Sequence, residues 1–370
     1  MRQKRYDGLD GVRATAAVGI VMMHVLSNGN YGLTGFLFTR VIPSMTDLVF
    51  LFMIVSGFSM CCGYYEKFTH KEITPAEFYS RRYRKILPFF SLLCLLDFAL
   101  FPSLDSLIEV FANLTMCFGL LPNAQISVIG VGWFVGLVCV FYFLFPFFCY
   151  LLSDKRRACG AFVAAVLFSF LCTRYFFNAD RVVAGFSSRT NIVFCAMFFL
   201  AGGLVYLWRE PIARFAHRFW YLVFLSIVGG IIGYYILPRA RTYWCLLTGT
   251  CILIFAIGVE RRGVLNNPVA AFFSKISLEI YLCHMVAFRI LERLHVVHWL
   301  PGACLNFVFT FLLTLGGAVL LSLGGKWVLG FLGQRVSHIV NKIKKRETGE
   351  TLDNKSTETP VESTHDANGE

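Results

Sequence analysis

Charged residues are scarce in this sequence: Asp, Glu, Lys and Arg together make up only 15% of its 370 residues, whereas hydrophobic residues make up 57%. Soluble globular domains use about 25% charged residues, because their surfaces face water. With 39 phenylalanines and a mean hydropathy of +0.64, the composition excludes an ordinary soluble domain. It predicts an all-α integral membrane protein that crosses the lipid bilayer several times.

Acidic residues are scarcer than basic ones, at 22 Asp and Glu against 34 Lys and Arg, which gives a net charge of +12. Such a surplus also occurs in proteins that bind nucleic acid, but here the basic residues lie in short clusters between apolar blocks, as membrane topology requires. The clusters are RQKR at 2–5, RRYRK at 81–85, DKRR at 154–157, REPIARFAHR at 209–218, ERR at 260–262 and KIKKR at 342–346. No nucleic-acid partner is expected.

Apolar stretches of about 20 residues, long enough to cross a bilayer as helices, recur along the chain. They lie near 10–27, 45–65, 86–102, 131–152, 158–177, 191–208, 219–237, 241–259, 269–291 and 303–332. A further stretch, 107–122, decides the topology, since a crossing there would move the next three basic clusters outside. Short basic loops stay cytoplasmic, so we expect 107–122 to be interfacial or re-entrant. The expected protein has ten transmembrane helices and both termini in the cytoplasm, and lies in the plasma membrane.

Composition divides the chain into three parts. Residues 1–335 are expected to form the membrane domain, 336–346 a basic cytoplasmic juxtamembrane segment, and 347–370 a disordered acidic tail, because that last segment is polar and almost free of apolar residues. The 13 cysteines include no Cys-x-x-Cys pair and no metal-ligand spacing, so no metal is expected.

The first span contains two ionisable residues, Arg13 and His24, eleven positions apart. That separation is three turns of helix and about 16 Å of rise, so both side chains share one face. Taken alone, Arg13 could reach back to the cytoplasmic headgroups, and His24 could bond a neighbouring helix as a neutral side chain. Together they favour an interior cavity or a substrate path, because ionisable groups inside a membrane are costly.

Later spans add further candidates. The stretch LVFLFMIVSGFSM contains a Ser-Gly pair beginning at Ser56, which either forms a small-residue packing seam or supplies a nucleophile. In RRYRK, Arg81 and Arg84 are three residues apart and share a helix face, which suits bidentate binding of phosphate. Membrane topology alone accounts for their neighbours Arg82 and Lys85.

Two more motifs lie in the fourth and ninth spans. Trp133 is followed by Phe134 at the start of the fourth, and SLEIYLCHM in the ninth contains Glu279 and His284. The last two residues are five apart, so about 140° separates them around the helix, and they do not both face one cavity squarely.

In this order, the motifs resemble those of the acyltransferase-3 family of integral membrane acyltransferases, most of which O-acetylate carbohydrates. The resemblance covers roughly residues 5–335 and has five parts. These are Arg13-x(10)-His24, FLFMIVSGF, RRYRKILP, WF followed by Tyr142 and Pro146, and SLEIYLCHM.

The resemblance implies an activity and a set of roles. The donor would be a cytoplasmic acyl-CoA, most often acetyl-CoA, and the acceptor a hydroxyl of a carbohydrate such as a cell-surface or exopolysaccharide glycan. His24 and Arg13 map onto the catalytic positions, and Arg81 and Arg84 onto the donor-binding pair. His24 would remove the acceptor hydroxyl proton, while the arginines hold the phosphates of coenzyme A. The supporting residues would be His284, Glu279, Ser56 and Trp133.

One departure and one competing function accompany this assignment. Many members have Ser-x-Glu-Glu shortly after the fourth-span tryptophan, whereas Trp133 is followed by FVGLVCVFY without an acid. Ten spans with interior charges also fit a multi-pass transporter or flippase of a glycan or small molecule, although such proteins commonly contain internal repeats and none is visible in the sequence. The sequence selects neither the acceptor, nor acetyl over succinyl, nor an oligomeric state.

Overall fold

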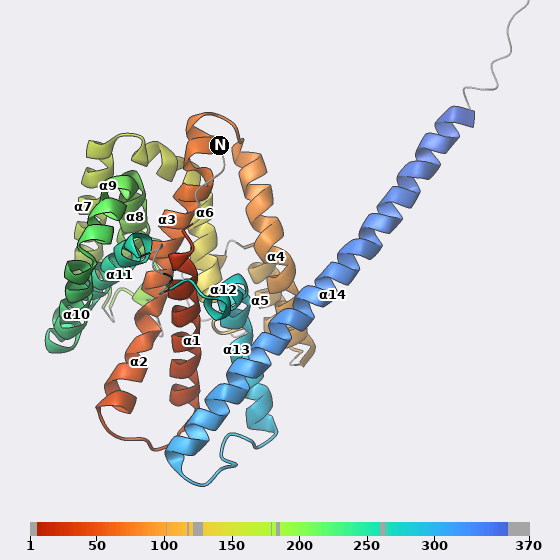
Figure 1. The fold of residues 1–370 in the computed structure, drawn as a ribbon. Helices are drawn as coiled ribbons and strands as arrows, with labels where there is room; N and C mark the ends of the chain where they lie inside the picture. The colour runs from red at the N-terminus through yellow and green to blue at the C-terminus, as the bar shows by residue number, and fades with distance from the viewer. Residues whose placement is uncertain are drawn as a thin grey trace, which may run out of the picture. The chain divides into compact units, whose positions relative to one another are not determined.

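The computed structural model describes residues 6–100, 102–116, 118–120, 129–178, 180–182, 186–259, 263 and 265–353. Every regular element within these ranges is a helix, which confirms the all-α prediction (Figure 1). The chain forms two compact units, Met1–Ser322 and Leu323–Glu370. The 51-residue helix α14 (Ala303–Asp353) begins in the first unit and continues into the second.

Six helical segments are long and apolar enough to cross a membrane. They are α1 (Gly8–Gly29), Leu37–Thr69 with α3 (Leu48–Thr69), α6 (Trp133–Leu152), Lys155–Phe176 with α7 (Lys155–Leu171), Pro238–Gly258 with α11 (Arg241–Gly258), and Ala303–Arg335 of α14. Two bent pairs raise the number to eight. They are α8 (Ile192–Leu207) with α9 (Arg209–Arg218), bent by 83°, and α12 (Pro268–Lys275) with α13 (Ser277–Arg293), bent by 72°. A multi-pass membrane protein is therefore confirmed.

The number ten and the cytoplasmic termini stay predictions. The two remaining predicted spans lie in α4 (Pro75–Leu100) and α10 (Trp220–Ile236). Helix α10 is apolar but has only 17 residues, and the RRYRK cluster at 81–85 leaves only the second half of α4 apolar. The stretch 107–122 contains α5 (Leu104–Leu114), whose 11 residues rise only about 16 Å, too short to cross a bilayer unaided.

Small residues bring α3 and α8 into direct backbone contact. A Cβ atom at Gly57 would overlap the carbonyl of Phe199, and one at Gly202 would overlap the carbonyl of Ile54. Such close approach is how helices associate in a membrane, where water provides no hydrophobic driving force. Gly57 of the Ser-Gly pair therefore lies in a packing seam, which was one of the pair's two interpretations.

Helix α1 occupies the centre of the first unit, in contact with α2 (Ile42–Ser44), α3, α11, α12 and α13. Figure 1 shows it with α2 and α3 on one side and α12 and α13 on the other. Its residues Ala16, Ala17, Ile20 and Val21 are almost wholly buried. The helix that bears Arg13 and His24 is thus enclosed by protein on most sides, and both residues face other helices.

Several predicted features fall partly beyond the described residues. The basic clusters at 2–5 and 260–262 lie outside them, as do residues 354–370 of the tail. Residues 336–346, and the tail as far as Asp353, belong to α14. The predicted division into a membrane domain, a basic segment and a disordered tail stays a prediction.

Candidate active site

A cavity of about 560 Å³ opens among α1, α3, α4, α6 and the bend between α12 and α13. Its size lies within the range of small-molecule sites, about 300–1,000 Å³. We call it the Arg13 cavity. Its polar lining residues are Asp10, Arg13, Ser56, Ser59, Arg82, Lys85, Tyr142, Ser274, Lys275, Ser277, Glu279 and Tyr281. Four of these are basic and two are acidic, so the cavity has a surplus of positive charge that suits an anionic ligand.

Arg13 is held inside this cavity by an ion pair within its own helix and by a hydrogen bond that it donates to α3. Its Nη2 donates to Ser59 Oγ at 2.6 Å, and its Nη1 lies 3.8 Å from Asp10 Oδ1. Asp10 in turn accepts a hydrogen bond of 2.6 Å from Ser274 Oγ. The guanidinium is therefore positioned by three helices and directed into the protein, not toward the lipid headgroups.

The cations that α4 contributes to the cavity are Arg82 and Lys85, which membrane topology alone had been expected to explain. The guanidinium of Arg82 lies 4.4 Å from the ring centroid of Tyr64 and 5.5 Å from that of Tyr142. Its Nε is buried without a hydrogen-bond partner among the described residues. The predicted donor-binding residues Arg81 and Arg84 are exposed and do not line this cavity.

Two histidines that the sequence suggested separately lie together in the structure. The ring centroids of His24 on α1 and His284 on α13 are 5.0 Å apart. His284 is fully buried, and its Nδ1 lies 3.3 Å from the carbonyl oxygen of Ile280. Because a carbonyl only accepts, that hydrogen bond requires a proton on Nδ1 and leaves Nε2 of a neutral ring as an acceptor. This Nε2 is buried and has no partner in the described part of the chain.

Tyr281 connects the Arg13 cavity to the histidine pair. It lines the cavity, and its ring centroid is 5.9 Å from that of His284 and 5.4 Å from that of Phe134. Its hydroxyl donates to the carbonyl of Val131 at 2.9 Å, which fixes the ring. Neither histidine lines the cavity, but this lining tyrosine packs against His284.

The remaining candidates divide between the cavity and its surroundings. Ser56 and Glu279 line the cavity. Trp133 packs against Phe134 with ring centroids 6.0 Å apart, and only Phe134 of the two is a lining residue. Asp97, an interior acid of α4 for which sequence spacing indicates no partner, pairs with Arg289 of α13 at 3.7 Å.

Within the ranges that the structure describes, no three His, Cys, Asp or Glu side chains gather closely enough to hold an ion.

Comparison with known proteins gives one match. The family model described as an acyltransferase domain, that of the acyltransferase-3 family, matches residues 6–323. No curated protein and no solved structure matches the chain significantly. The matched range takes in every described residue of the Arg13 cavity and the histidine pair, and because it covers most of the chain, the protein belongs to the acyltransferase-3 family.

Proposed function

We propose that this protein is a plasma-membrane O-acyltransferase that moves an acetyl group from cytoplasmic acetyl-CoA to a hydroxyl of a carbohydrate. The observation that supports this proposal most directly is the basic Arg13 cavity, whose lining residue Tyr281 packs against His284, the partner of His24. A family of acyltransferases needs an acyl donor, and coenzyme A is a polyanion with a long neutral arm. A cavity with several basic side chains in its wall and a histidine pair behind one of its tyrosines suits both parts of that molecule.

The donor enters from the cytoplasm with its phosphates at the cations of the Arg13 cavity. Arg82 and Lys85 bind them. Arg13, fixed by Ser59 and Asp10, provides further guanidinium N–H donors for a phosphate oxygen. The pantetheine arm then extends along α1 toward His24, a distance of about 16 Å by helix rise. In this assignment Arg82 and Lys85 take the roles that the resemblance gave to Arg81 and Arg84.

His24 acts as the general base. It accepts the proton of the acceptor hydroxyl as that oxygen attacks the thioester carbonyl; a C–O bond forms, the C–S bond breaks, and the proton passes to the departing thiolate. His24 suits this role better than His284 because it is partly accessible, whereas His284 is fully buried. His284 is a positioning residue, whose acceptor Nε2 stabilises the charge that His24 gains in the reaction.

The proposal is tested by incubating membranes that contain the protein with labelled acetyl-CoA and host glycans. Release of free coenzyme A and base-labile label on glycan are the expected results, and both should disappear in His24→Ala at equal protein abundance. Full activity in His24→Ala would overturn the mechanism. A wild-type protein that consumes no donor with any glycan would overturn the function itself, and would favour a transporter.

A further inference from the structure

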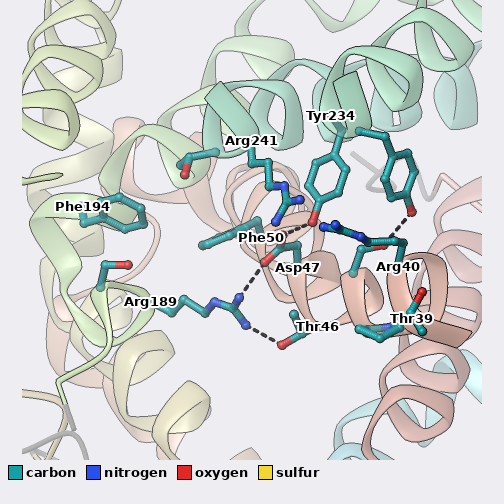
Figure 2. Close-up of a pocket in the computed structure, with 14 residues that line it drawn as sticks. Thr39, Arg40, Thr46, Asp47, Phe50, Arg189, Phe194, Tyr234 and Arg241 are labelled. Carbon is teal, nitrogen blue, oxygen red and sulfur yellow. Dashed lines mark hydrogen bonds and ion pairs between the residues drawn. The ribbon is translucent and has the colours of Figure 1, made fainter. Parts of the chain in front are cut away.

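A second cavity, of about 330 Å³, lies at the start of α3, whereas Arg13 bonds Ser59 in the middle of that helix. We call it the Arg189 cavity. Its walls come from the segment η1 to η2 (Leu37–Asp47), the start of α3, the turn η5 (Ser188–Thr190) and the junction of α10 with α11. Figure 2 shows the guanidinium groups of Arg40, Arg189 and Arg241 reaching from three of these segments toward Asp47 and Tyr234.

Only one of the three arginines is neutralised by an acid among the described residues. Arg189 Nη2 lies 2.9 Å from Asp47 Oδ1, and Asp47 Oδ2 accepts a hydrogen bond of 2.8 Å from Tyr234 Oη. Both carboxylate oxygens of Asp47 are thus engaged. No ion pair to Arg40 or Arg241 occurs in the described ranges, and Arg241 Nε is buried without a partner there. The cavity therefore has two positive charges in excess.

The walls of the cavity are held in place by further contacts. Arg189 also donates to the hydroxyl of Thr46, and its guanidinium lies 6.0 Å from the ring centroid of Phe50. The hydroxyl of Tyr235 pairs with Ser44 Oγ at 2.8 Å. Preorganised guanidinium forks suit carboxylate and phosphate groups, and tyrosine rings offer flat apolar faces edged by hydroxyls. The site thus suits a polar, anionic ligand whose ring can pack against the faces of the tyrosine side chains.

The Arg189 cavity also lies close to the histidine pair. Helix α1 packs against the segment that bears Thr46 and Asp47, since a Cβ atom at Gly19 would lie 2.6 Å from Leu48 Cδ1 and 3.5 Å from Met45 Sδ. His24 follows less than two turns later on the same helix. Five residues correspond to about 140° around a helix, so His24 lies on a different face of α1 from this contact. The Arg189 cavity therefore borders the segment of α1 that leads to the general base.

We propose that the Arg189 cavity is the acceptor site and that it selects a sugar bearing an anionic group, a carboxylate or a phosphate. This inference rests on the proposed function. Arg40 and Arg241 bind the anionic group, and the Arg189–Asp47 pair together with Tyr234 orients the sugar ring so that a free hydroxyl faces His24. Donor and acceptor then enter through separate cavities and meet only at the histidine.

The kinetic test uses membranes with the full chain, labelled acetyl-CoA and host glycans. The acetylated product should bind an anion exchanger, and Arg241→Gln and Arg40→Gln should each raise the acceptor KM at least tenfold while the acetyl-CoA KM is unchanged. Arg241→Lys should recover part of the loss. Arg239→Gln is the matched control, because Arg239 is an exposed neighbour that does not line the cavity. A neutral product, or an unchanged acceptor KM in both glutamine variants, overturns the inference.

A binding test separates this inference from the proposed function. Glucuronic acid and glucose 6-phosphate should raise the melting temperature of the purified full chain, glucose should not, and the shift should vanish in Arg40→Gln but persist in Arg239→Gln. If these shifts occur while no donor is consumed, the anionic-sugar site stands and the function fails. Equal shifts with inorganic phosphate or with phosphatidylglycerol nanodiscs would overturn the sugar assignment in favour of a free anion or a lipid headgroup.

Discussion

At the residue scale, His24 and His284 differ in exposure: the His24 side chain is partly accessible, whereas His284 is fully buried. His24→Ala is expected to lower kcat by about 10²–10⁴-fold, the usual contribution of a general base. His284→Phe keeps a buried ring but removes both nitrogens, and should lower kcat by about tenfold with little change in the acetyl-CoA KM. His284→Gln should recover part of that loss, because its amide again supplies an acceptor. Equal kcat in His284→Phe and wild type, at equal melting temperature, would leave His284 with a packing role only.

Helix α4 allows a second test, because it bears two basic i, i+3 pairs, Arg82 with Lys85 and Arg81 with Arg84, and only the first lines the Arg13 cavity. Arg82→Gln removes a cation of the Arg13 cavity and should raise the acetyl-CoA KM about tenfold to a hundredfold, since hydrogen bonds to charged groups contribute about 1.5–3 kcal/mol. Arg84→Gln removes an exposed charge two positions away and should leave that KM unchanged. If Arg84→Gln raised the acetyl-CoA KM more than Arg82→Gln, the donor site would be assigned to Arg81 and Arg84.

At the scale of elements, the close contact of α3 with α8 predicts where added volume is not tolerated. Gly57→Val should lower the melting temperature and the amount of protein in the membrane, because its side chain overlaps the Phe199 carbonyl and overpacking costs about 1–3 kcal/mol. Gly229→Ala on α10 is the control, since no atom lies within 4 Å of its added Cβ. Melting curves in detergent compare the two variants. Equal melting temperatures would contradict the close backbone contact between α3 and α8.

Element packing also explains what the sequence could and could not predict. Arg13, His24 and His284 were recognisable because ionisable groups in apolar stretches are costly, but their neighbours depend on how α1 packs against α13. The sequence also contains a signal for the phase of α4, which favours Arg82 over Arg84 at an inward-facing position. Phe78, Ile86 and Phe89 are buried, and Arg82 continues their spacing of three to four residues, whereas Arg84 does not.

The Arg189 cavity could not be predicted in the same way. Its residues come from four segments between position 39 and position 242, and none of its arginines stands in a motif. Arg40 and Arg241 are ordinary loop or helix-end arginines when taken one at a time. They become candidate ligand-binding residues only because Arg189 and Tyr234 engage both carboxylate oxygens of Asp47. That arrangement is visible only in the folded chain.

At the scale of the whole molecule, the two cavities require a definite topology. The donor is cytoplasmic, so the Arg13 end of α1 must face the cytoplasm, and the Arg189 cavity must then open toward the opposite side. In the ten-span arrangement, the turns at Glu72 and Gly263 lie inside, whereas those at Arg239 and Gly302 lie outside. Six spans would place the turns at Arg239 and Gly263 on the other side, whereas eight spans, which omit both α4 and α10, leave all four turns in place. The side of each turn therefore tests the mechanism and distinguishes ten spans from six.

An epitope inserted after each of these four residues, one per variant, makes the test. In sealed right-side-out vesicles, antibody should reach the epitopes after Arg239 and Gly302 without detergent, and those after Glu72 and Gly263 only with it. Acetyl-CoA consumption by each variant is the control for folding. If the epitope after Arg239 were protected, an odd number of the seven predicted spans before it, α10 alone for example, would not cross the membrane, and the Arg189 cavity would face the same side as the donor. An acceptor would then have to be a cytoplasmic sugar, such as a precursor modified before export, because an anionic sugar outside the cell would have no route to Arg241.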